Sequence, residues 1–157
     1  MESPVVNALA VLAPVSGRVS DMGTVPDPVF SAALVGPGVA IDPDPTATTA
    51  VAPVAGRVVK LHPHAFVIAA DDGRAVLVHL GIDTVELAGA GFELLVTEGD
   101  VVEPGQPIVR WDPSLVRASG RSSLVPVVAL EAEADELQQI ADLNGVVHSG
   151  DRLFDIA

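Results

Sequence analysis

Two histidines fifteen residues apart, His64 and His79, are the residues of this chain most able to do chemistry. Apolar runs lie between them at residues 65–70 and 75–78, and the polar residues DDGR at 71–74 separate the runs. This pattern predicts a β-hairpin that brings the two imidazoles together. Two neutral imidazoles side by side suit phosphoryl transfer or metal binding. The alternative is that both are partly buried structural histidines.

The register of the hairpin decides which faces the histidines occupy. A two-residue loop at residues 72–73 is the shortest closure of the turn sequence. In that register Phe66 faces His79. His64 then faces Gly81, so both imidazoles are expected on one face of the hairpin in diagonal positions.

The composition predicts the kind of scaffold that holds these residues. The 157 residues are 49% apolar but only 3% aromatic, and they include 14 Gly and 13 Pro, which favours many short strands over long helices. We expect an all-β fold, an antiparallel β-sandwich or barrel with a few short helices. The expected organisation is an N-terminal tail at residues 1–10 and a single domain at residues 11–157.

Two repeats and two helical segments mark the expected elements. The segment APVSGRV at residues 13–19 returns as APVAGRV at 52–58, which predicts two similar strand entries. Residues 99–109 and 145–154 each predict a strand, a glycine turn and a second strand, and resemble the hammerhead elements of biotinyl and lipoyl domains. Short helices are predicted over 113–118, with Asp112 as the N-cap, and over 132–143.

Charge and residue usage exclude several classes of function. The chain has no cysteine, so a disulfide, a thiolate zinc site and a cysteine nucleophile are ruled out. A net charge of −13 with one lysine argues against nucleic acid and anionic membranes as partners, and favours a basic protein. The N-terminal residues lack the basic and apolar regions of a signal peptide, so a cytoplasmic protein is expected.

Several short motifs resemble one known family when they are taken in order. They are VPD at 25–27, VGPG at 35–38, APVAG at 52–56, HAF at 64–66, HLGIDTV at 79–85 and GF at 91–92. Over residues 10–157 the chain resembles the glucose-type IIA component of the bacterial sugar phosphotransferase system. The resemblance implies a compact β-sandwich that carries phosphate between proteins.

The resemblance also implies a role for each residue of the hairpin site. His79 is expected to accept a phosphoryl group on Nε2 from the phosphohistidine of the carrier HPr, and to pass it to a cysteine of the IIB domain of a membrane sugar permease of the IIBC type. The Gly81 carbonyl would hold Nδ1–H of His79, and His64 would stabilise the phosphoryl oxygens. The protein would therefore be cytoplasmic and visit the inner face of the membrane through the permease. Further regulatory target proteins are compatible with the family.

The resemblance places a partner surface around the two histidines. Asp27 and Asp83 are expected to border the site and to meet basic residues of HPr, while also serving as turn and cap residues. An apolar rim is expected to surround them, formed by Val29, Phe30, Val35, Leu61 and Leu77.

One position departs from the family pattern. Relatives usually carry a threonine two residues before the first active-site histidine, and His62 stands there in this chain. We expect either that His62 supplies a hydrogen bond that orients His64, or that Pro63 stiffens the loop enough to make that bond unnecessary.

Three other functions compete with a phosphocarrier. His62, His64 and His79 could bind zinc in a metal enzyme, because three histidines form a known catalytic ligand set. A biotin or lipoate carrier would need an attachment lysine at a hairpin tip, but Lys60 lies within an expected strand. A non-catalytic regulatory binding module would have structural histidines. No cofactor is obligatory, although His64 and His79 could share zinc with the carboxylate of a partner.

Overall fold

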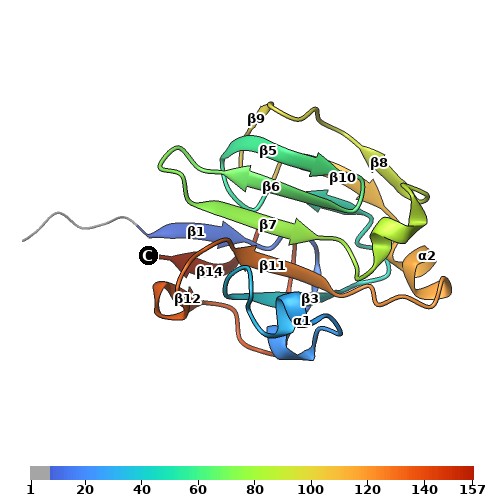
Figure 1. Ribbon diagram of the computed structural model, residues 1–157, viewed down its shortest axis with the longest axis horizontal. Helices are drawn as coiled ribbons and strands as arrows, with labels where there is room; N and C mark the ends of the chain where they lie inside the picture. The colour runs from blue at the N-terminus through green and yellow to red at the C-terminus, as the bar shows by residue number, and fades with distance from the viewer. Residues whose placement is uncertain (1–7) are drawn as a thin grey trace, which may run out of the picture.

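Short strands rich in valine and alanine assemble into three antiparallel sheets (Figure 1). The computed structural model describes residues 8–157. Its two α-helices are both short, α1 (Pro28–Ser31) and α2 (Pro113–Ala118). The predicted all-β fold is therefore confirmed. Within the described residues, no helix has the length and apolar character needed to cross a membrane.

The largest sheet has eight strands and carries the two histidines at one end. In spatial order its strands are β13 (Val146–Val147), β2 (Gly17–Asp21), β3 (Gly38–Pro43), β11 (Val125–Ala129), β7 (Ala75–His79), β6 (Ala65–Ala69), β5 (Gly56–His62) and β9 (Val101–Val102). Every pairing within this sheet is antiparallel.

Two three-stranded sheets and three 3₁₀ turns complete the fold. The first small sheet consists of β1 (Leu9–Leu12), β14 (Arg152–Ile156) and β12 (Leu137–Gln139), and the second of β4 (Thr49–Val51), β10 (Pro107–Trp111) and β8 (Phe92–Leu94). The 3₁₀ turns are η1 (Met22–Thr24), η2 (Thr84–Leu87) and η3 (Ala134–Glu136).

Alternation along β7 decides which side chains face the main core. Val76 and Val78 are fully buried in the large apolar cluster between the sheets, whereas Leu77 and His79 are only partly buried. Successive residues of a strand point to opposite faces, so His79 lies on the outer face of the eight-stranded sheet. A second, smaller cluster that includes Phe30 and Ile82 covers part of this outer face beneath α1.

The two predicted strand entries are confirmed, because β2 and β5 each begin at the glycine of its repeat. The arginine that follows each glycine makes an equivalent bond. Arg18 donates to the carbonyl of Asn144 and Arg57 to the carbonyl of Gly99, both over 2.7 Å. The paired segments also match, since β13 lies beside β2 and β9 beside β5.

Of the two predicted helices, one is confirmed and one is wrong. Helix α2 has the predicted bounds, and the Asp112 carboxylate accepts hydrogen bonds from the amides of Ser114 and Leu115. Residues 132–143 form only the single turn η3 followed by strand β12. Strand β14 explains the difference, because β12 pairs along it with Leu137 opposite Ile156. Pairing to an open sheet edge has overridden a helical pattern of apolar residues.

The predicted boundary of the N-terminal tail is also corrected. Leu9 and Ala10 belong to β1 and pair with Ile156 and Asp155 of β14, so ordered structure begins before residue 11. Residues 1–7 of the predicted tail lie outside the described residues.

The β6–β7 hairpin has a three-residue loop instead of the predicted two-residue loop. Ala70 donates its amide to the carbonyl of Arg74, and Gly73 adopts φ +93° in the left-handed region. A three-residue loop that ends in a left-handed glycine is a common hairpin closure. It shifts the register by one residue, so that Ala65, and not Phe66, lies opposite His79.

Candidate functional site

His79 stands at the end of β7 with its ring held on two sides. The ring centroid lies 5.2 Å from that of Phe30, at an interplanar angle of 59°. Its Nδ1 lies 2.5 Å from the carbonyl oxygen of Gly81. A carbonyl oxygen can only accept a hydrogen bond, so Nδ1 carries the proton. In the neutral ring, Nε2 therefore keeps its lone pair.

Gly81 brings its carbonyl to His79 through a turn that excludes a side chain at this position. Its φ is +80°, in the region that favours glycine. A Cβ at residue 81 would lie 2.6 Å from the methyl carbon of Thr84 and 3.0 Å from the carbonyl oxygen of Ser122. The close approach of these two groups makes glycine necessary here.

His64 reaches His79 from the turn that joins β5 to β6. His62 and Ala65 pair across this turn, so Pro63 and His64 are its two central residues. The His64 and His79 ring centroids are 5.2 Å apart, with an interplanar angle of 67°. The predicted proximity is confirmed, but the predicted placement opposite Gly81 is wrong, since the carbonyl of His64 accepts from the amide of Leu80 over 2.7 Å.

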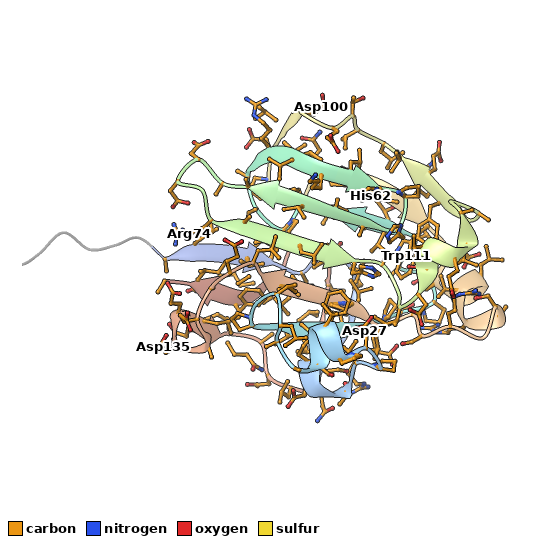
Figure 2. The ribbon with its side chains drawn as sticks, in the orientation of Figure 1. Asp27, His62, Arg74, Asp100, Trp111 and Asp135 are labelled. Carbon is orange, nitrogen blue, oxygen red and sulfur yellow. The ribbon has the colours of Figure 1, made fainter. Side chains whose placement is uncertain are left out.

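His62 forms the outer member of a row of three imidazoles. Its ring stacks on that of His64, with centroids 5.6 Å apart and an interplanar angle of 24°. In residues 8–157 we find no hydrogen bond between the two rings, so the contact is a stack and not the predicted bond. Figure 2 shows that His62 and Asp27 both lie to the right of Arg74, which follows the β6–β7 loop.

Burial keeps both inner histidines neutral. Desolvation lowers the pKa of His79 below its ordinary value, although the bond to Gly81 and the carboxylates of Asp27 and Asp83 act in the opposite direction. Burial also lowers the pKa of His64, with further lowering by His79 and His62. At neutral pH both rings are therefore uncharged, as a nucleophilic imidazole must be.

The two predicted acidic residues differ in their local roles. Asp27 is the N-cap of α1, and its carboxylate accepts from the amide of Val29 over 2.9 Å. Asp83 is exposed and adopts φ +59°, and its side chain makes no capping bond to η2. The expected capping role of Asp83 is wrong, but both carboxylates act electrostatically on His79.

The predicted apolar rim is partly corrected. Val29 is 41% exposed, and Val35 and Leu77 are half-buried against the second core cluster on the outer face. Leu61 does not belong to this rim, because it pairs with the buried Phe66 and packs against the main core. Phe30 is only 6% exposed and packs against the His79 ring and the second core cluster, so it supports the site from below and offers little surface to a partner.

Two of the competing functions find no support in the geometry. In the part of the chain that the structure describes, no three histidine or acidic side chains are arranged to hold a metal ion. Lys60 lies inside β5, where a carrier would instead require a hairpin tip.

Two groups that hold the site were missed in the sequence. Thr84 is fully buried and its hydroxyl donates to the carbonyl of Leu80 over 2.8 Å, although a buried threonine looks like any turn residue in the sequence. The carbonyl of Ser122 accepts from the amide of Ile82 over 2.9 Å. A main-chain contact between such distant residues leaves no signal in a single sequence.

Comparison with known proteins finds relatives over most of the chain. Residues 9–134 match the family model for the phosphoenolpyruvate-dependent sugar phosphotransferase system, EIIA 1. The chain is 36% identical over 150 residues to the glucose-specific EIIA component of the phosphotransferase system of Staphylococcus aureus, covering 94% of this chain and 89% of that protein. It is 39% identical over 132 residues to the corresponding Bacillus cereus protein, covering 83% and 79%.

A solved structure extends the similarity to three dimensions. The glucose permease IIA from Mycoplasma capricolum superimposes with a TM-score of 0.87 at 33% sequence identity. The match covers 96% of this chain and 97% of that one, so nearly the whole fold is shared.

Proposed function

The chain belongs to the EIIA 1 family of the phosphoenolpyruvate-dependent sugar phosphotransferase system, and from that premise we propose that it carries a phosphoryl group between proteins on Nε2 of His79. The observation that supports this most directly is the bond from Nδ1 of His79 to the Gly81 carbonyl, with a second imidazole 5.2 Å away. This arrangement offers an unprotonated nitrogen beside a group that can stabilise a transferring phosphoryl group.

The chemistry consists of two in-line displacements. In the first, the Nε2 lone pair of His79 attacks phosphorus, and the P–N bond to the phosphohistidine of HPr breaks, with its electron pair returning to the histidine of HPr. In the second, a cysteine thiolate of a IIB domain attacks the same phosphorus. The bond to Nε2 then breaks and its electron pair returns to His79. The Gly81 carbonyl keeps Nδ1–H in place during both steps.

His64 acts on the phosphoryl oxygens and forms no covalent bond. Negative charge spreads over these oxygens in a loose transition state, and an adjacent imidazole N–H stabilises it. Loss of such a donor typically slows a reaction by about 10²–10³. The His64 ring is half-buried and lies between the rings of His62 and His79.

The partners follow from the surface around the site. Net charge of −13, with Asp27 and Asp83 beside His79, would steer a basic carrier such as HPr toward this end of the sheet. Val29, Val35 and the half-buried Leu77 would give apolar contact to HPr, to the IIB domain of a sugar permease at the inner face of the membrane, and to regulatory targets. The relatives reported above are named as glucose-specific.

In this proposal, zinc would bind only at the interface with a partner protein. His64 and His79 would supply two nitrogen ligands, and a partner would have to supply a carboxylate to complete the set. The neutral state of both rings suits metal coordination. No step of phosphoryl transfer depends on the ion.

The test is reconstitution with phosphoenolpyruvate, enzyme I and HPr, followed by intact-protein mass spectrometry. We expect one acid-labile, base-stable phosphoryl group on the wild-type protein and none on His79→Ala. His64→Ala should still be labelled but should donate about 10²-fold more slowly to a IIB domain. Equal labelling of His79→Ala and wild type would refute the assignment of His79.

A further inference from the structure

We propose that Thr84 is a positioning residue: its buried hydroxyl fixes the turn that presents the Gly81 carbonyl, and so selects the tautomer of His79. The effect on phosphoryl transfer rests on the function proposed above. The effect on the tautomer does not, because it concerns the resting protein alone.

The first observation is the bond that closes the turn. The Thr84 side chain has no exposed surface, and its hydroxyl donates to the carbonyl of Leu80 over 2.8 Å. This bond spans the residues between the end of β7 and the start of η2, and Gly81 lies inside it. The Thr84 methyl group lies directly against the Gly81 Cα, since a Cβ there would be 2.6 Å away from it. The same side chain therefore ties the turn and packs beneath it.

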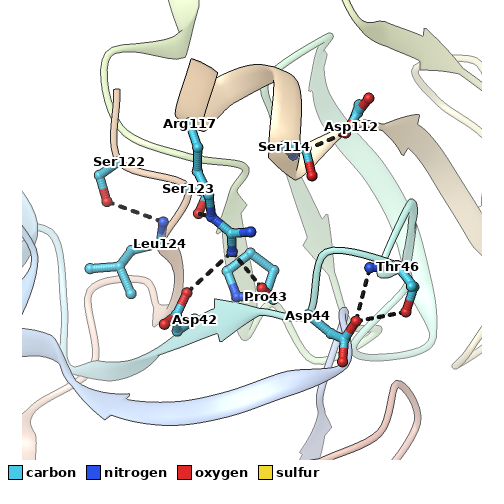
Figure 3. Close-up of polar contacts among 10 residues, drawn as sticks. All are labelled: Asp42, Pro43, Asp44, Thr46, Asp112, Ser114, Arg117, Ser122, Ser123 and Leu124. Carbon is cyan, nitrogen blue, oxygen red and sulfur yellow. Dashed lines mark hydrogen bonds and ion pairs between the residues drawn. The ribbon is translucent and has the colours of Figure 1, made fainter. Parts of the chain in front are cut away.

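The second observation is another anchor of the same turn, made by the main chain of a distant segment. The amide of Ile82 donates to the carbonyl of Ser122 over 2.9 Å. The segment that contains Ser122 is itself held by Arg117, which donates from Nε to the hydroxyl of Ser123 over 2.7 Å and from Nη2 to the carbonyl of Pro43 over 2.6 Å (Figure 3). The bond to Ser122 thus fixes the position of Ile82. The hydrogen bond of the Thr84 hydroxyl then fixes the backbone orientation of the rest of the turn.

The orientation of this turn matters because it places the Gly81 carbonyl against the His79 ring. It accepts from Nδ1 of His79 and thereby favours the tautomer in which Nε2 is unprotonated. A turn that loosens moves this oxygen off the Nδ1–H direction, and the tautomer protonated on Nε2 then becomes populated. That tautomer has no lone pair on Nε2 with which to attack phosphorus.

Two substitutions at Thr84 separate its hydroxyl from its methyl group. Thr84→Val keeps the branched shape and removes the hydroxyl, whereas Thr84→Ser keeps the hydroxyl and removes the methyl. Thr46→Val is the control for the same substitution at an exposed site, since Thr46 also donates a hydroxyl bond, to Asp44 in the β3–β4 loop (Figure 3). The tautomer of His79 is measured by ¹⁵N NMR of the imidazole, and labelling by phospho-HPr is measured as a rate.

We expect Thr84→Ser and Thr46→Val to keep the Nδ1–H tautomer of wild type and to be labelled within about twofold of its rate. Thr84→Val should populate the Nε2–H tautomer and be labelled about tenfold more slowly, because small misplacements of reacting groups carry effects of this size. A wild-type tautomer and rate in folded Thr84→Val would overturn the proposal. A shifted tautomer in Thr84→Ser would also overturn it, whether or not Thr84→Val folds. If wild type itself is not labelled, the proposed function fails while the NMR comparison still decides the role of Thr84.

Discussion

Replacing Gly81 by alanine should damage both the fold and the site, and replacing Gly73 should damage the fold alone. Both glycines have left-handed backbones, with φ +80° and +93°. Alanine in this conformation costs roughly 1–2 kcal/mol of folding free energy. A Cβ at residue 73 meets nothing within 4 Å, so Gly73→Ala should lose only that amount.

Gly81→Ala carries an additional steric cost. Its Cβ would lie 2.6 Å from the Thr84 methyl carbon, 3.0 Å from the Ser122 carbonyl oxygen and 3.2 Å from a methyl of Val116. Overpacking of this kind typically costs about 1–3 kcal/mol. The total loss at Gly81 should therefore be about 2–5 kcal/mol. For a chain of 157 residues, each kcal/mol lowers Tm by about 2–4 °C.

Urea unfolding of the two variants measures these losses, and labelling by phospho-HPr measures the consequence for the site. Gly73→Ala should be labelled like wild type, since its loop lies at the far end of β7 from His79. Folded Gly81→Ala should be labelled at least tenfold more slowly, because relief of the clash must move the carbonyl that holds His79. Equal destabilisation by the two substitutions, or unchanged labelling of Gly81→Ala, would refute the reasoning.

Three further outcomes follow from the electrostatics and stacking of the site. Histidine in the unfolded chain binds a proton near pH 6.5, whereas burial lowers the pKa of His79 in the folded protein. The unfolding free energy should therefore fall as the pH drops below about 6.5, and His79→Gln should lessen the fall. A flat profile of unfolding free energy against pH in urea titrations would contradict this. His62→Phe preserves a stacked ring and should transfer phosphate to a IIB domain like wild type. His62→Ala should be about fivefold slower, because one ring stack contributes about 1 kcal/mol, and equal rates for both variants would make His62 a bystander. The association rate with HPr, measured by stopped-flow mixing, should fall as the salt concentration rises. Attraction between surface charges is screened beyond about 8 Å at physiological ionic strength. A salt-independent rate would show that the acidic surface plays no part in partner binding.

The elements best predicted from the sequence are those whose local signals and tertiary context agree. Helix α2 has a capping aspartate, a proline in its first turn and a glycine after its end, and the structure preserves all of these features. The repeated strand entries at β2 and β5 likewise combine a turn, a glycine and an alternating strand. Residues 132–143 had a helical apolar pattern, but they lie where β14 needs a partner strand, and that requirement is invisible in a local window.

The hairpin register shows a different limit of sequence-based reasoning. The turn residues DDGR fit a two-residue or a three-residue loop, and the choice depends on backbone geometry at Gly73. A shift of one residue exchanges the faces of all opposing positions. The predicted meeting of His64 with His79 nevertheless holds, because His64 lies in the turn before β6, where the constraint of strand alternation does not apply.

The site thus divides into a part encoded locally and a part that depends on tertiary structure. The six residues 79–84 contain the proposed nucleophile, the carbonyl that holds its Nδ1–H and the hydroxyl that fixes this carbonyl. His64 comes from a separate turn, and the bond from the Leu80 amide to its carbonyl joins that turn to the first part. Perturbing residues 79–84 should therefore impair acceptance of the phosphoryl group. Perturbing the β5–β6 turn should instead leave acceptance largely intact and slow donation, since only the proposed stabiliser is displaced.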